Sequence, residues 1–141
     1  MTKCPDQEPD LVTDPALLEV LDDLARHEPL FHRPEQGTTR ADFDRLTAPD
    51  YWEVGASGQR YSREYIWSIL EQRYATTPPQ WPEKNSATTD FHLRELAPDT
   101  YLLTYTLHQP NRLTRRLTAW QRRRHGWTAL YHQGTVVTPP S

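Results

Sequence analysis

The chain has 141 residues and a formal net charge of −3 at pH 7, with 35% hydrophobic and 11% aromatic residues. This length suits one domain and is too short for two of ordinary size, and the charge gives no support to nucleic-acid binding. No stretch approaches the ~20 apolar residues that cross a bilayer, and the first residues lack the apolar core of a signal peptide. With Cys4 as the single cysteine, no internal disulfide or thiolate metal cluster can form. We expect a soluble, cytoplasmic protein with neither nucleic acid nor membrane as partner.

The N-terminal region predicts a tail followed by a long helix. Residues 1–13 are polar and aperiodic, which is typical of a flexible tail. Asp14 and Pro15 have the pattern of an N-cap and a first helical residue, and leucines follow at helical spacing. The helix is expected to run to about His32, with Glu28-Pro29 as a point where it kinks or shortens.

The middle of the chain predicts two more helices around a strand. A short helix from Arg40 to Thr47 follows Thr38 and Thr39, either of which suits its N-cap. Residues 51–57 read as a strand that ends at a glycine-containing turn. Ser62 is the expected N-cap of a third helix with an apolar face, which a proline-rich loop over residues 77–82 ends.

The remaining residues predict four strands joined by short turns, which favours antiparallel pairing. The strands are expected at residues 87–96, 101–107, 113–123 and 127–137. A sheet of this size needs a cover on its apolar face, and the three helices can supply it. We therefore predict a single α+β domain over residues 14–137, followed by a short tail over residues 138–141.

Two segments resemble a known superfamily. They are YWEVGASG at residues 51–58, followed by a helix start at 61–63, and the ending GW at 126–127 with YHQGT at 131–135, preceded by Trp120. The chain resembles a bacterial branch, of unknown function, of the nuclear transport factor two-like superfamily, which includes SnoaL-like and ketosteroid-isomerase-like proteins. The resemblance implies a cone-shaped curved antiparallel sheet around a long N-terminal helix, an internal pocket, and in many members a homodimer through the outer sheet face. Since this fold hosts many activities, the resemblance implies no particular reaction.

Glu53 is the first candidate catalytic residue, because isomerase relatives place a catalytic carboxylate at about this position, with Val54 and Gly55 as neighbouring alternatives. Desolvation in a pocket would raise the pKa of the carboxyl and suit it to general-base catalysis. The alternative interpretation, which we favour, is a structural ion pair with Arg60 or Arg63.

His132 is the second candidate, within the polar run of residues 132–135 in an otherwise apolar strand. It has the chemistry of a proton shuttle, but we favour a structural histidine bonded to a carboxylate such as Glu53. Gln133 would face the opposite side of the sheet unless a bulge at Gly134 twists the strand. We interpret Gly134 as allowing close approach at the narrow end of the pocket.

The candidate ligand-binding residues are aromatic and basic side chains. Trp67 and Trp120 are the expected pocket walls, although rings also serve simply to fill a core poor in leucine and isoleucine. A carbonyl or anion would be held by Arg116, His108 or Gln133. Arginines crowd residues 112–124, where they either solvate strand ends or attract an acidic partner.

No metal site or cofactor is expected. The histidines lack the spacing of a zinc enzyme, and Ser57 lacks the elbow spacing of a hydrolase nucleophile. Two functions remain open. The first is a small-molecule pocket protein, with lyase or isomerase chemistry as an option, which needs a polar cavity of ~300 Å³ or more. The alternative is a non-catalytic dimeric interaction module, which needs no cavity.

Overall fold

The computed structural model describes residues 7–75 and 86–138. Its helical elements are η2 (Pro15–Leu17), α1 (Leu18–Ala25), η3 (Pro34–Gln36), α2 (Arg40–Leu46) and α3 (Arg63–Ala75). Its strands are β1 (Thr47–Val54), β2 (Arg60–Ser62), β3 (Ala87–Ala97), β4 (Thr100–Gln109), β5 (Arg112–Arg123) and β6 (Gly126–Val136). The α+β class and the four C-terminal strands are as predicted.

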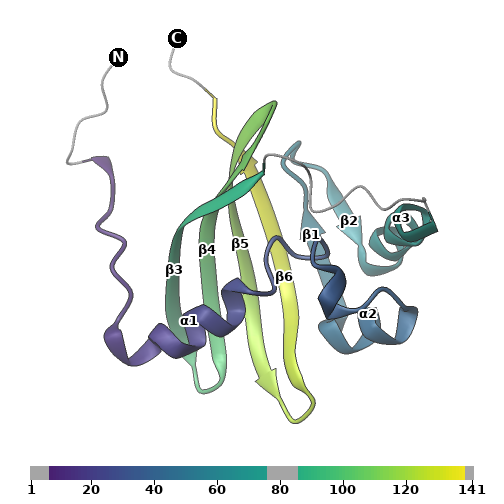
Figure 1. Ribbon diagram of the computed structural model, residues 1–141, viewed down its shortest axis with the longest axis horizontal. Helices are drawn as coiled ribbons and strands as arrows, with labels where there is room; N and C mark the ends of the chain where they lie inside the picture. The colour runs from purple at the N-terminus through teal and green to yellow at the C-terminus, as the bar shows by residue number, and fades with distance from the viewer. Residues whose placement is uncertain (1–6, 76–85, 139–141) are drawn as a thin grey trace.

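The strands form one mixed sheet in the order β2-β1-β6-β5-β4-β3 (Figure 1). Strands β3 to β6 pair antiparallel as a meander, because each connection is a short turn. Strand β1 instead pairs parallel with β6, and this register places Glu53 beside His132. The sheet is thus mixed rather than purely antiparallel. Strands β1 and β6 are neighbours away from both edges of the sheet.

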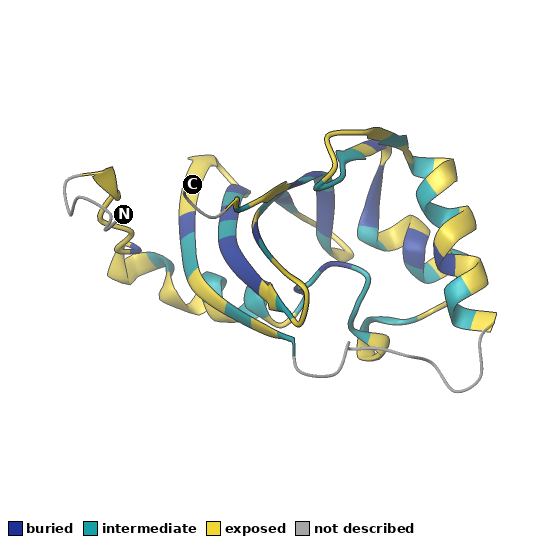
Figure 2. Ribbon diagram, turned by 90° about the horizontal axis from the view of Figure 1, so that it is seen from above, coloured by how far each residue is buried: buried dark blue, intermediate teal, exposed yellow. Residues whose placement is uncertain are grey.

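The helices cover one face of this sheet, which we call the inner face. Helix α1 lies across the meander, while α2 and α3 lie beside β1 and β2 (Figure 1). Buried residues gather mainly on the strands (Figure 2). The core consists of Leu24, Leu30, Tyr51, Leu93, Tyr101, Leu103, Trp120 and Ala129.

Two predicted helix starts are confirmed by their caps. The Thr39 side chain accepts from the backbone N–H of Asp42, whose carboxylate accepts from Thr39 in return, so α2 begins with a capping box. Ser62 Oγ accepts from the N–H of Tyr65 at 3.1 Å at the start of α3. Local side-chain chemistry therefore determines where both helices begin.

The prediction of a long first helix is wrong. Helix α1 has eight residues and ends at Ala25, whose carbonyl accepts from Glu28 N–H in a closing turn. Pro29 has no N–H with which to continue the helical ladder. The Glu28 side chain turns inward and is fully buried. Helix α1 therefore ends before Glu28, and the Glu28 carboxylate lies in the core.

The two predicted tails lie partly in the described residues. Thr13 is buried and its Oγ1 accepts from Leu93 N–H, so the chain already contacts the sheet before α1. Cys4 and the predicted loop over residues 77–82 lie outside the described residues. Within the described parts of the chain, no helix is long and apolar enough to cross a membrane.

Candidate functional site

A cavity of about 100 Å³ lies between the inner face of the sheet and α3. Its walls come from β1, β5, β6, α3 and the segment after α1: Leu30, Phe31, His32, Glu53, Ile66, Ile69, Leu70, Arg73, Arg116 and His132. The volume corresponds to about three water molecules and does not reach the ~300 Å³ that we expected of a small-molecule pocket. The cavity therefore fits a ligand of few heavy atoms, or one part of a larger ligand.

The sheet register brings the two predicted catalytic residues to this cavity. Glu53 and His132 are neighbours across the parallel pair of β1 and β6. Tyr51, two residues before Glu53, shares its side of the strand and donates from its hydroxyl to Glu53 Oε1 at 2.8 Å. Trp52 lies between them in sequence and points to the outer face, where its ring contacts Tyr131.

Glu53 is the one carboxylate among the described residues that line the cavity. Burial raises its pKa above 4.5, while the hydrogen bond from Tyr51 and the charges of Arg116 and Arg73 oppose the rise. The predicted ion pair with Arg60 or Arg63 is not formed among the described residues, and Arg63 instead pairs with Asp44 at 3.0 Å. In the described structure Oε2 of Glu53 receives no hydrogen bond, so it is free to accept a proton from a ligand.

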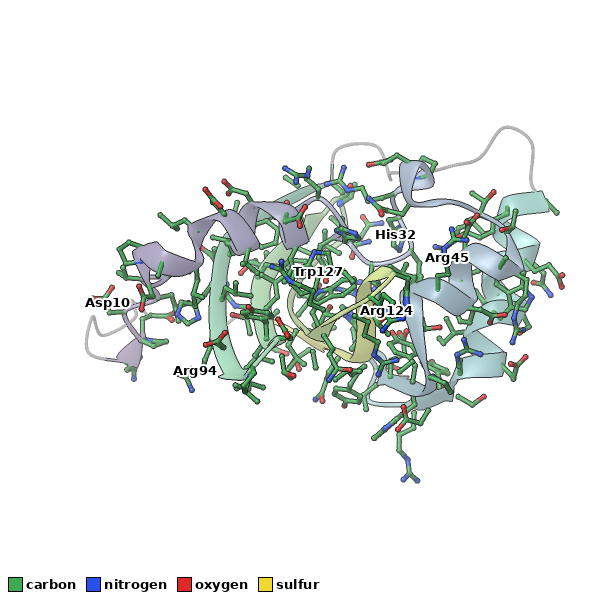
Figure 3. The ribbon with its side chains drawn as sticks, turned by 90° about the horizontal axis from the view of Figure 1, so that it is seen from below. Asp10, His32, Arg45, Arg94, Arg124 and Trp127 are labelled. Atoms are coloured by element: carbon green, nitrogen blue, oxygen red, sulfur yellow. The ribbon has the colours of Figure 1, made fainter. Side chains whose placement is uncertain are left out.

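Two arginines face the cavity, each beside a histidine. Arg73 Nη1 lies 3.5 Å from His32 Nε2, and Arg116 Nη1 lies 3.3 Å from His132 Nε2. An arginine can only donate, so both imidazole Nε2 atoms must be acceptors. Each histidine is therefore neutral, and each guanidinium keeps N–H groups that no described residue accepts from. Figure 3 shows His32 on the segment that crosses from α1 toward α2 and α3.

A buried hydrogen-bond chain determines the tautomer of His132. Since Nε2 accepts from Arg116, the ring proton is on Nδ1, which donates to Thr118 Oγ1 at 2.7 Å. The Thr118 hydroxyl is then free to donate toward the Glu28 carboxylate, whose pKa it lowers. The chain Glu28–Thr118–His132 thus links a fully buried carboxylate to the cavity wall.

Glu28 is the centre of this network. Its Oε1 accepts from Tyr105 Oη at 2.7 Å and from Leu30 N–H at 2.9 Å, and its Oε2 accepts from Trp120 Nε1 at 3.1 Å. Burial raises the pKa of Glu28, and the surrounding donors, Thr118 first, act against that rise. Four donors therefore stabilise this carboxylate inside the core.

The two cavity histidines are expected to stay neutral well into the acid range. Burial lowers the pKa of His32 to about 4, with Arg73 and Arg116 adding to the shift. Burial, followed by Arg116, lowers the pKa of His132 to about 3. His132 is therefore poorly suited to shuttle protons near neutral pH, and its bonds to Thr118 and Arg116 favour a structural role.

These pKa values predict that His32 and His132 show no titration between pH 7 and pH 5 in ¹⁵N NMR spectra of the folded protein. In the urea-unfolded chain both should titrate near the ordinary value of about 6.5. Between these pKa values the unfolded chain binds more protons, so the contribution of the two histidines to stability is complete above pH 6.5 and falls as the pH drops. Folded-state midpoints near 6.5 would contradict the buried, arginine-facing placement.

The structure separates the other predicted site residues from the cavity. Trp67 packs between Phe43 and Tyr74, and Trp120 is fully buried in the core against His27. His108 is exposed and hydrogen-bonds Thr89. Gln133 lies on the outer face, where its Oε1 accepts from Tyr131. Thus Glu53, His132 and Arg116 meet at one cavity, whereas Trp67, Trp120, His108 and Gln133 do not.

Gly134 lies beside one cavity arginine. A Cβ at this position would lie 3.5 Å from Cζ of Arg116 and 3.7 Å from the backbone nitrogen of Ala56. The predicted close approach at Gly134 is therefore to a guanidinium side chain and to the turn after β1. A Cβ at this position would make ordinary van der Waals contacts with both.

Sequence reasoning missed His32, Arg73 and Glu28 as site residues. Arg73 had a readable signal, because Ile66, Ile69, Leu70 and Arg73 share one helical stripe, and the stripe ends on a charged residue. Glu28 and His32 carried no such signal, since their partners are distant strands.

Among the described residues, no group of three or more histidine, cysteine, aspartate or glutamate side chains is placed to hold a metal ion. The arginine-rich segment is also not one uniform patch. Arg115 pairs with Asp90 at 3.4 Å and Arg122 lies over the Trp127 ring at 4.6 Å, whereas Arg116 turns into the cavity. Because successive side chains of a strand point to opposite faces, Arg116 faces the cavity while Arg115 faces the other side of the sheet.

Comparison with solved structures identifies the fold. A nuclear transport factor two-like protein from Cytophaga hutchinsonii matches with a TM-score of 0.63 and 13% identity over 89% of this chain and 100% of that chain. A cystatin-like fold protein from Burkholderia xenovorans matches with a TM-score of 0.64 and 14% identity, over 90% of this chain and 96% of that chain. A candidate ketosteroid isomerase from Parabacteroides distasonis matches with a TM-score of 0.56 and 14% identity, over 94% of this chain and 95% of that chain.

No protein-family model matches the chain, and neither does any curated protein. The chain therefore has the nuclear transport factor two-like, cystatin-like fold, as its two sequence segments predicted. Because sequence identity to these structures is low, the likeness extends to the fold and leaves the activity to be argued from the site.

Proposed function

We propose that the protein binds a small molecule in the Glu53 cavity and transfers a proton at a carbon atom next to a carbonyl group, as a lyase or isomerase without a cofactor. The observation that carries this proposal is Glu53 itself. It has a raised pKa, a carboxylate oxygen that receives no hydrogen bond from the described residues, and two cationic neighbours in one cavity.

The chemistry follows from these three properties. A carboxylate with a raised pKa is, in its ionised form, a stronger base than an exposed one. Glu53 Oε2 would take the proton from the carbon atom, and the C–H electron pair would form a C=C bond as the carbonyl π electrons move to oxygen. The resulting enolate oxygen would be stabilised by N–H groups of Arg116 or Arg73. Return of the proton to the same or another carbon completes the reaction.

Deuterium exchange tests this reaction class without knowledge of the natural substrate. Acetone, 2-butanone and pyruvate would be incubated with the protein in D₂O, and loss of the α-proton signals would be followed by ¹H NMR. We expect exchange above the buffer rate for at least one of the three compounds. Buffer-level exchange for all of them, with the protein folded, would contradict proton transfer by Glu53.

A second candidate function is self-association through the outer sheet face. No helix of the described chain covers this face (Figure 1), and Trp52 is 43% exposed there beside Tyr131. Burial of such a ring pair favours association. We expect a dimer in sedimentation velocity that Trp52→Glu shifts to monomer without loss of folding. A wild-type monomer at about 100 µM would argue against the dimeric module.

A further inference from the structure

We infer that the ligand of the Glu53 cavity is a small monoanion that carries a carboxylate group. This inference names the ligand class of the same cavity and so rests on the proposed function for the site, but its evidence is separate. It depends on Arg73 and Arg116 rather than on the basicity of Glu53.

The first observation is that both guanidiniums lack a carboxylate partner. Arg40, Arg45, Arg63 and Arg115 each pair with an acidic side chain within 4.0 Å. Neither Arg73 nor Arg116 has such a partner within the described residues, although both are substantially buried and burial lowers the pKa of each. Buried cations are usually paired, and within the described residues these two lack the close carboxylate partner that an anionic ligand would supply.

The second observation is that the two arginines act on the same groups. Both contribute to the pKa of Glu53 and both contribute to that of His32. Both also line the cavity, Arg73 from α3 and Arg116 from β5. Their neighbouring imidazoles are neutral and cannot supply negative charge.

The third observation is the charge count of the cavity. Among the described residues that line the cavity, two arginines and Glu53, taken as its carboxylate, sum to one net positive charge, which a monoanion neutralises. A dianion such as phosphate would leave negative charge beside Glu53. A carboxylate also matches the planar fork of a guanidinium, with two parallel N–H···O bonds, whereas the cavity of about 100 Å³ limits the bound part to a few heavy atoms.

The substrate class that follows is a short carboxylic acid with a carbonyl group or other acidifying group near its reactive carbon. Its carboxylate would lie against one guanidinium, and its reactive carbon would face Glu53 Oε2. Thr114 Oγ1 accepts from Arg116 Nε at 2.9 Å and so fixes that guanidinium in place. The remaining Nη2 of Arg116 is the donor most available to the ligand.

Propionate and propionamide test this inference, because they have the same number of heavy atoms and differ in charge. Each would be titrated into the full chain at low ionic strength while the Arg Nε–Hε signals are followed by ¹H–¹⁵N NMR. We expect propionate to shift the Arg73 and Arg116 signals, with a dissociation constant on the order of millimolar, and propionamide to bind at least about tenfold more weakly.

Variants locate the site. Arg116→Gln and Arg73→Gln should each weaken propionate binding about tenfold or more, and Arg116→Lys should restore only part of the affinity because the fork is lost. Arg123→Gln is the matched control, since Arg123 is an exposed arginine of the same strand. Its affinity for propionate should equal that of the wild type.

The outcomes separate this inference from the proposed function. Equal binding of propionate and propionamide, tighter binding of inorganic phosphate, or unchanged affinity in both arginine variants would each overturn the carboxylate assignment. Propionate binding without exchange of any carbonyl compound would sustain the ligand class and contradict proton transfer. Exchange of acetone or 2-butanone without propionate binding would sustain proton transfer and contradict the carboxylate ligand class.

Discussion

Replacement of Glu28 by alanine should destabilise the protein by about 3–5 kcal/mol, the largest loss of stability that we predict for this protein. The change leaves the Tyr105 and Thr118 hydroxyls, the Trp120 indole N–H and the Leu30 N–H without their acceptor, and it also opens a void in the core. A domain of this size is typically stable by only about 5–15 kcal/mol. Urea unfolding followed by tryptophan fluorescence measures the loss.

Two further variants make this prediction specific. Glu28→Gln keeps the shape and one acceptor oxygen but turns an amide NH₂ toward donors, so its loss should lie between zero and that of alanine. Glu71→Ala removes an exposed carboxylate from α3 and should change stability by no more than about 0.5 kcal/mol. A Glu28→Ala protein as stable as Glu71→Ala would show that the buried carboxylate does not organise the core.

Glu53→Gln should reduce α-proton exchange by about 10²- to 10⁴-fold while the protein stays folded. The amide cannot act as a base, but its oxygen can still accept from the Tyr51 hydroxyl at the position of Oε1. Burial opposes ionisation of Glu53, so a neutral side chain should change the free energy of unfolding by no more than about 1 kcal/mol.

Asp50→Asn is the matched control for this variant, because Asp50 is an exposed carboxylate of the same strand. Exchange rates for both variants would be measured by ¹H NMR in D₂O at equal protein concentration. Wild-type exchange in Glu53→Gln would remove Glu53 from the mechanism. A similar loss in both variants would point to a general effect on the strand.

Most of the fold was predictable from local patterns. The caps at Thr39 and Ser62 and the alternation of the last four strands depend on residues close in sequence. The end of α1 was not predictable in the same way, since the leucine spacing continues to favour a helix until Glu28 turns inward. Its four donors come from Leu30 and from strands β4 and β5, far along the chain.

The candidate site was only partly predictable, again because contacts between residues distant in sequence form it. The resemblance to known sequences marked Glu53 and His132, but the parallel pairing of β1 with β6 that makes them neighbours joins strands more than 70 residues apart. Arg116 was one of six arginines in its segment, and only the alternation of β5 distinguishes its direction. Arg73 lies on the same helical stripe as the apolar residues of α3, so its position predicts that it faces inward although its charge predicts that it faces solvent.

The pKa of Glu53 in the folded protein is the most direct test of the whole account. Titration of the ¹³Cδ signal of Glu53, assigned by its absence in Glu53→Gln, measures that value in the full chain. A partly dry cavity around a general base requires a midpoint above 4.5, the ordinary value for this side chain. A midpoint at or below 4.5 would mean that the carboxylate is solvated or held as an ion pair, and the cavity would lose its base.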